Sequence, residues 1–181
     1  MIIALAGRRI DPPDAEEERF PLEMKDAVYA RILEIFKKNA ATILVSSAAC
    51  GADLLAQKAA RELKIRQHII LPFSRRRFRK TSVTDRPGVW GNLFDEICSE
   101  VKDKGNLTVL RKYKDETAAY QAVTDKILEL AEDLQRKNES VKAVIVWEGK
   151  AKDADDATAA FAEKARLRNI AVKEIITKKL S

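Results

Sequence analysis

Small side chains dominate residues 46–53, where an apolar run gives way to a helical pattern. The stretch reads SSAACGAD. A strand that ends here and passes Gly51 into a helix leaves backbone N–H groups at the helix N-terminus, where the helix dipole favours an anion such as phosphate. Ser46 and Ser47 add hydroxyl groups, and Ala48 is small enough to let a ligand approach. The turn therefore predicts an anion site.

Asp53, in the first turn of the same helix, has two interpretations. Its carboxylate can accept a hydrogen bond from a ribose hydroxyl, or it can cap the helix. Cys50 fits a small buried side chain better than a nucleophile, because the only histidine, His68, is distant in the sequence and lies within a strand pattern.

A second candidate site follows the first apolar run, in the sequence AGRR. Gly7 permits a tight turn, and Arg8 and Arg9 place positive charge after it. If no ligand binds here, Gly7 forms a turn and the two arginines after it are in contact with water. The loop that continues to Pro21 is long, and long loops at this edge of a sheet are often functional.

Basic side chains gather after the third apolar run, in LPFSRRRFRK. Pro72 ends the strand, Phe73 follows it, and Arg75 begins the cationic loop 74–80. These cations predict a clamp for a phosphorylated ligand or a contact with a nucleic-acid backbone, although a solvated basic loop has the same composition.

The fifth apolar run ends in VIVWEGK. Trp147 offers a face on which a base can stack, and Glu148 offers a carboxylate. The alternative for Trp147 is an aromatic side chain that closes the core.

The spacing of apolar residues predicts the elements that carry these sites. Strands are expected at 2–6, 42–46, 66–71, 107–110, 141–147 and 170–176, and helices at 21–39, 52–64, 89–104, 115–138 and 155–168. Strands that alternate with helices predict a single doubly wound α/β domain over residues 1–181, with a mostly parallel sheet, helices on both faces and a Rossmann-like order. Ligands of such sheets bind beyond the carboxyl ends of the strands.

Composition narrows the class of protein. The net charge is +6, from 34 basic and 28 acidic residues, and Cys50, Cys98 and His68 lack the spacing of a zinc site. The first apolar run is too short for a signal peptide, and no run is long enough to span a membrane. We therefore expect a cytoplasmic protein without a membrane partner or a protein-bound metal.

The order of these motifs resembles the SLOG superfamily, which groups DprA-like proteins with LOG or lysine-decarboxylase-like proteins. The resemblance covers nearly the whole chain, and its most specific parts are Gly7-Arg8-Arg9 and the Ser47–Asp53 turn, which is similar to the pattern sGGAxGAD. It implies a Rossmann-like fold that binds nucleotides or nucleotide-derived ligands. Some members cleave N-glycosidic bonds, and others are sensor domains in bacterial defence.

Two positions depart from the family pattern. Ala48 replaces a glycine, and only Thr158 remains of the PGGxGTxxE turn of the glycosidase branch. We therefore expect a sensor that binds a nucleotide without cleaving it efficiently. Mg²⁺ can bind together with this ligand. The alternatives are a nucleotide N-glycosidase with Glu148 or Asp53 as its acid, and a DprA-like DNA-binding domain; a homo-oligomer is compatible with each.

Overall fold

The computed structural model describes residues 1–110, 113, 115–154 and 156–178, and its centre is a six-stranded sheet. The strand order is β4-β3-β2-β1-β5-β6, and all five pairings are parallel. The strands are β1 (Ile2–Gly7), β2 (Ile43–Ser46), β3 (Arg66–Leu71), β4 (Leu107–Val109), β5 (Val141–Trp147) and β6 (Ala171–Ile176).

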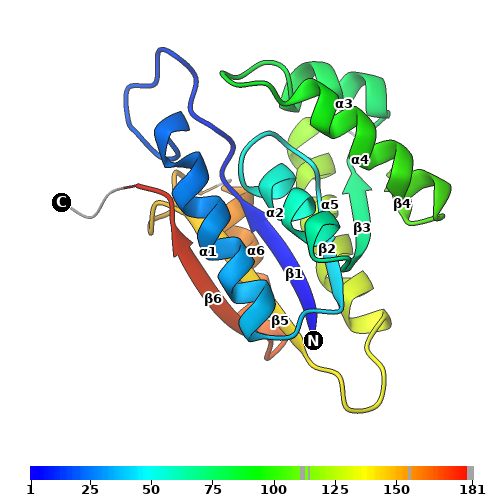
Figure 1. The fold of residues 1–181 in the computed structure, drawn as a ribbon. Helices are drawn as coiled ribbons and strands as arrows, with labels where there is room; N and C mark the ends of the chain where they lie inside the picture. The colour runs from blue at the N-terminus through cyan, green and yellow to red at the C-terminus, as the bar shows by residue number, and fades with distance from the viewer. Residues whose placement is uncertain (111–112, 114, 155, 179–181) are drawn as a thin grey trace.

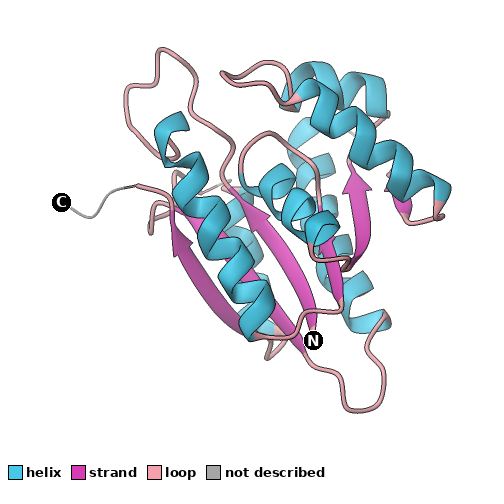
Figure 2. Cartoon of the chain, viewed as in Figure 1, coloured by secondary structure: helices cyan, strands magenta, loops and turns pink. Residues whose placement is uncertain are grey.

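Helices cover both faces of this sheet (Figures 1 and 2). One face carries α1 (Lys25–Lys38), which follows the short 3-10 helix η1 (Leu22–Met24), together with α2 (Ala52–Glu62) and α4 (Gly91–Asp103). The other face carries α5 (Glu116–Asp133) and α6 (Ala157–Leu167). The predicted doubly wound α/β fold is confirmed.

Two apolar layers hold the helices to the sheet, because successive strand side chains point to opposite faces. In β1, Ile3 and Leu5 pack with the layer under α1, α2 and α4, whereas Ile2 and Ala4 pack with the layer under α5 and α6. All four side chains are fully buried. This explains why the strand is apolar at every position and not at alternate ones.

The order of the strands reverses beside β1. The chain moves outward from β1 through β2 and β3 to β4, and then α5 returns it to β5 on the other side of β1. The loops that leave β1 and β5 therefore diverge to opposite sides of the sheet. That divergence opens a crevice at the carboxyl ends of the strands, where α/β proteins of this type bind ligands.

One predicted element was wrong in type. The basic segment expected as loop 74–80 lies in helix α3 (Arg75–Ser82). Ser74 caps the helix, since its hydroxyl accepts a hydrogen bond from the amide of Arg77. Phe78 anchors the helix by stacking near Phe94, with 6.0 Å between the ring centroids. Phe78 is thus the one apolar side chain that this highly charged helix buries.

The helices in the described ranges are too short or too polar to cross a lipid bilayer.

Candidate functional site

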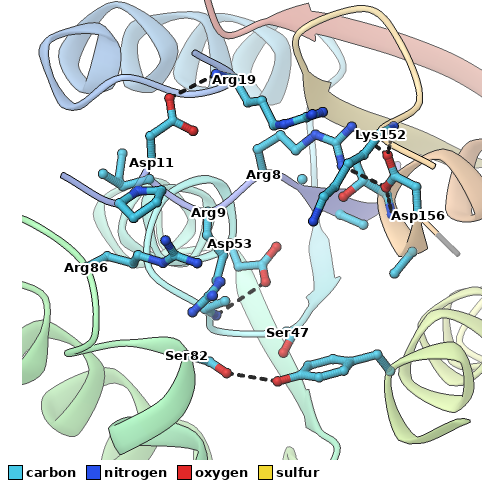
Figure 3. A pocket seen from close by; sticks show the side chains of 18 of the residues that line it. Arg8, Arg9, Asp11, Arg19, Ser47, Asp53, Ser82, Arg86, Lys152 and Asp156 are labelled. Carbon is cyan, nitrogen blue, oxygen red and sulfur yellow. Dashed lines mark hydrogen bonds and ion pairs between the residues drawn. The ribbon is translucent and has the colours of Figure 1, made fainter. Parts of the chain in front are cut away.

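A cleft of about 1040 Å³ opens at the carboxyl ends of β1, β2 and β5 (Figure 3). Its walls come from the loop after β1, from the end of α3 and from the first turns of α5 and α6. The predicted site residues that line this cleft are Gly7, Arg8, Arg9, Ser47, Asp53 and Thr158. The cleft therefore lies where the strand order reverses, and its lining brings together residues from five separate segments, within 6–19, 47–53, 78–86, 116–127 and 152–158.

Arg8 is largely buried on one side of the cleft. Its Nε donates to Glu148 at 2.6 Å, and its Nη1 and Nη2 donate to Asp156 at 2.7 and 2.6 Å. A further bond joins Nη2 to the carbonyl of Lys150 at 3.0 Å. A guanidinium that meets two carboxylates through its planar fork is firmly oriented, so Arg8 ties β1 to the loop after β5 and to the start of α6.

Asp156 links this cluster to α6. It is the N-cap residue of the helix and accepts hydrogen bonds from the amides of Thr158 and Ala159, while the amide of Lys152 bonds to its other oxygen. Burial acts to raise the pKa of Asp156, but the bonds from Arg8 and from these amides outweigh it and hold the pKa below its usual value. The amide of Thr158, which faces the cleft, is thus already occupied by a carboxylate of the chain.

The loop after β1 is fastened at both ends. Asp11 closes its base by accepting hydrogen bonds from the amides of Arg19 and Phe20, each at 2.9 Å. Arg19 then reaches Glu148 at 2.7 Å and Glu17 at 2.9 Å. The loop therefore joins the Arg8 cluster, which we define as Arg8, Arg19, Glu148 and Asp156.

Arg9 turns to the opposite side of the cleft (Figure 3). Its Nη1 contacts both oxygens of Asp85, at 3.0 and 2.8 Å, and the carbonyl of Thr81 at 3.0 Å. Its side chain remains 30% exposed. Arg86 lies beside it, and the Nε of Arg86 is buried without a hydrogen-bond acceptor among the described residues. The nearest carboxylate oxygen, on Asp85, is 3.5 Å away.

Asp53 and Ser47 form the floor of the cleft between Arg8 and Arg9 (Figure 3). The Oδ2 of Asp53 accepts a weak hydrogen bond from the amide of Ala49 at 3.3 Å. Burial raises the pKa of Asp53 to about 7, against the opposing effects of this bond and of the nearby Arg9. Near neutral pH the carboxyl group can therefore either donate or accept a proton.

The turn of small residues is filled by the chain itself. Gly51 has φ +99°, and a Cβ on it would lie 2.7 Å from the carbonyl oxygen of Arg8 and 3.0 Å from the Cα of Arg9. The amide of Ala52 donates to that same carbonyl, and the amide of Cys50 donates to the carbonyl of Ser82. The small side chains thus admit the start of the loop after β1, which carries the two arginines, and these two amides already have partners.

The other predicted residues of this turn lie behind the cleft. Ser46 is buried, with its hydroxyl bonded to the carbonyl of Ser47 and to the side-chain amide of Gln57. Ala48 is fully buried in the apolar layer under α2. A Cβ on Gly7 would approach that of Ala52 to 2.5 Å, so Gly7 permits close contact between β1 and α2.

Trp147 and Glu148 lie outside the lining of the cleft. The indole Nε1 of Trp147 donates to Glu174 of β6 at 3.0 Å. The side chain of Glu148 is fully buried between Arg8 and Arg19. Of the two carboxyl groups considered as catalytic acids, only that of Asp53 faces the cleft.

Pro72, Phe73 and Arg75 belong to a second hollow of about 710 Å³, between α3, β4 and α5. Arg75, Arg77 and Arg79 of α3 form ion pairs with Asp95 and Glu116. The predicted site residues are therefore distributed between two hollows and the interior.

Sequence reasoning missed Arg19, Arg86 and Asp156. An aspartate directly before the apolar helix of residues 157–167 is an N-cap signal that indicates the position of Asp156. Arg86 lies in an irregular loop, and no local pattern indicates that this loop returns to the tip of β1. Among the described residues, no three acidic, cysteine or histidine side chains group as a metal site requires.

Comparisons of the chain with protein-family models, with curated proteins and with solved structures found no match.

Proposed function

We propose that the protein binds a nucleotide or a nucleotide-derived signalling ligand in the cleft at the carboxyl ends of β1, β2 and β5. The observation that carries the proposal is that Arg9 and Arg86 both line the cleft and share one partly exposed carboxylate, that of Asp85. Two cations with one counter-charge leave net positive charge on this side of the cleft. A phosphate between Arg86 and Arg9 would neutralise that charge and would add charge-assisted hydrogen bonds.

The remaining surfaces of the cleft suit the neutral parts of such a ligand. Ser47 and Asp53 on the floor can bond to sugar hydroxyls, and Val123 and Ile127 of α5 offer an apolar wall to a base. The cleft volume is at the upper end of the range for small-molecule sites. The order of the motifs, which is similar to that of the SLOG superfamily, supports the same ligand class, and Mg²⁺ would arrive with the ligand's phosphates.

A thermal-shift panel tests the proposal. Nucleoside monophosphates, cyclic dinucleotides, NAD and ADP-ribose are compared with inorganic phosphate and with free nucleosides, each with and without Mg²⁺. A ligand that binds only the folded state raises the unfolding temperature in proportion to its concentration relative to Kd. We expect one phosphorylated ligand to exceed both controls, and Arg86→Ala to abolish that excess while Arg31→Ala on exposed α1 retains it. Equal shifts for all compounds would remove the proposal.

Hydrolysis of an N-glycosidic bond is the second candidate function, and Asp53 is the observation that favours it. A carboxyl group with a pKa of about 7 at the floor of a cleft suits general acid catalysis. It can give its proton to the departing base while water adds to the sugar carbon. Chromatography of free base, released over multiple turnovers and lost in Asp53→Asn, distinguishes this enzyme from a sensor that returns its ligand intact.

DNA binding through α3 remains a prediction with a separate test. A contact with the phosphate backbone weakens steeply as salt rises and depends little on sequence. Fluorescence anisotropy of a labelled oligonucleotide between low and moderate salt measures both properties, and the triple variant of Arg76, Arg77 and Lys80 to Ala should remove the binding.

A further inference from the structure

The second hollow lies beyond the carboxyl ends of β3 and β4, at the edge of the sheet. Its wall is shared with the cleft, since Glu116 at the start of α5 lines both. Arg77 of α3 forms an ion pair with Glu116 at 2.5 Å. Glu116 is the one described residue that lines both hollows, so the inference below rests on the lining of the second hollow and not on the function proposed for the cleft.

The floor of the second hollow is apolar and includes two aromatic side chains. Leu107, Val109, Leu110 and Ala119 contribute aliphatic surface from β4 and α5. Phe73 is fixed from two directions, by the edge of Tyr120 at 6.0 Å between ring centroids and by the guanidinium of Arg77 at 4.2 Å from its own centroid. Tyr113 is 41% exposed, which makes it one of four large apolar side chains that are exposed in the described ranges.

Among the described residues that line this hollow, the charged groups leave an excess of positive charge. The two acidic side chains are already engaged, because Asp115 caps α5 by accepting from the amide of Ala118 and Glu116 is paired with Arg77. Arg75 retains a 32% exposed side chain after its contacts with Asp95 and Ser99. Lys102 has no ion-pair partner in the part of the chain that the structure describes.

We propose that the second hollow is a binding site for a small ligand with an aromatic or apolar body and one anionic group. The body would lie against Phe73 and Tyr113, where each square ångström of apolar surface removed from water contributes about 25 cal/mol. The anionic group would meet Lys102 and Arg75 at the rim. A fully apolar ligand would leave these cations without a counter-charge, and a fully polar one would leave the floor exposed.

A pair of fluorescent probes that differ in charge tests this assignment. 8-Anilinonaphthalene-1-sulfonate carries a sulfonate on an aromatic body, and N-phenyl-1-naphthylamine has a similar body without the charge. We expect saturable one-to-one binding of the sulfonate probe, about tenfold tighter than that of the neutral probe, as one charge-assisted hydrogen bond implies. Near-UV circular dichroism confirms that the protein remains folded, because loosened proteins also bind the sulfonate probe.

Matched variants locate the bound probe. Lys102→Glu should remove the preference for the sulfonate, and Tyr113→Ser should weaken both probes several-fold. Lys38→Glu on α1 and Leu167→Ser, which replaces a side chain that is 77% exposed on α6, are the controls for charge and for apolar surface. Arg86→Ala in the cleft should change neither affinity.

Two results would overturn the proposal. One is equal affinity for the two probes in the wild-type protein, or no saturable binding of either. The other is an effect of Arg86→Ala or of the control variants as large as that of Lys102→Glu and Tyr113→Ser.

Discussion

Arg8 and Arg9 are neighbours in the sequence, yet they stand on opposite sides of the cleft in opposite chemical settings (Figure 3). Arg8 is 9% exposed and bonds to two carboxylates that are themselves buried. Arg9 shares the partly exposed Asp85 with Arg86, whose Nε lacks a hydrogen-bond acceptor among the described residues. The first side is neutralised by buried carboxylates of the protein, whereas on the second side two arginines share one carboxylate, and it is this second side to which we assign the anion of the proposed ligand.

The difference in burial predicts a structural role for Arg8, and it is compatible with the binding role that we propose for Arg9. A buried ion pair is costly to break, because removing one partner leaves the other charge without compensation in a low dielectric. A pair at the surface contributes little to stability, since water screens it. We therefore expect substitutions on the Arg8 side to affect folding, and substitutions on the Arg9 side to affect ligand binding.

Removing Arg8 should have the largest effect on stability. Arg8→Ala leaves Glu148 and Asp156 buried without their main cation, so we expect the free energy of unfolding to fall by about 3–5 kcal/mol. Urea unfolding followed by circular dichroism measures this loss. Arg31→Ala, on the exposed face of α1, is the control and should change stability by less than about 0.5 kcal/mol. Similar values for the two variants would show that the Arg8 cluster does not hold the loops together.

Asp53 should make stability depend on pH. Its pKa is about 7 in the folded protein and lower in the unfolded chain, so the folded state binds more protons between about pH 4 and 7. Stability therefore falls as the pH rises through this range, by about 2–4 kcal/mol at most. Asp53→Asn stays neutral and should lack this component, whereas Asp103→Asn at the exposed end of α4 should keep it. Parallel pH profiles for wild-type protein and Asp53→Asn would contradict the assignment.

Gly51 tests whether the turn of small residues exists to admit the two arginines. Gly51→Ala places a Cβ against the backbone of Arg8 and Arg9 and also strains a positive φ. Gly149→Ala is the control, because Gly149 has a similar φ of +96° and its added Cβ would meet only the Cδ1 of Ile176, at an ordinary contact distance of 3.5 Å. We expect the control to cost about 1–2 kcal/mol from backbone strain, and Gly51→Ala to cost measurably more. Equal losses in thermal unfolding would mean that the loop after β1 can move away from the added Cβ at little cost.

The sequence was sufficient for the fold, because the strands are apolar on both faces and the helices have a clear period. Ile3 and Leu5 share one face of β1. The buried residues of α1 and α5 likewise recur on one face of each helix, at the helical period. Helix α3 was missed because a single residue, Phe78, carries its packing, and the surrounding charge hides the pattern.

The position of the cleft follows from the topology, but the environment of its side chains does not. Parallel topology alone brings Gly7, Arg9, Ser47 and Asp53 to one edge of the sheet. The environment of each side chain depends on contacts between distant segments, such as Arg8 with Glu148, which are 140 residues apart. For that reason the sequence did not indicate that Arg8 is neutralised, or that the chain itself occupies the space beside Gly51.

Removing Arg9 should have the smallest effect on stability. The ion pair with Asp85 is about one-third exposed at both side chains, so we expect Arg9→Ala to lower the free energy of unfolding by about 1 kcal/mol or less. Urea unfolding of Arg9→Ala and Arg8→Ala under the same conditions compares the two losses directly. A loss as large as that of Arg8→Ala would show that Arg9, like Arg8, is needed mainly for the stability of the fold.

The most direct test measures ligand-induced stabilisation in wild-type protein and in Arg9→Ala. The nucleotide of the panel with the largest shift is titrated against both, and the rise in unfolding temperature is recorded at each concentration. We predict that Arg9→Ala retains nearly the wild-type unfolding temperature without ligand and loses most of the rise with it. An undiminished rise in Arg9→Ala, or the absence of a rise in the wild-type protein with every nucleotide, would contradict the assignment of the Arg9 side as the anion-binding side of the cleft.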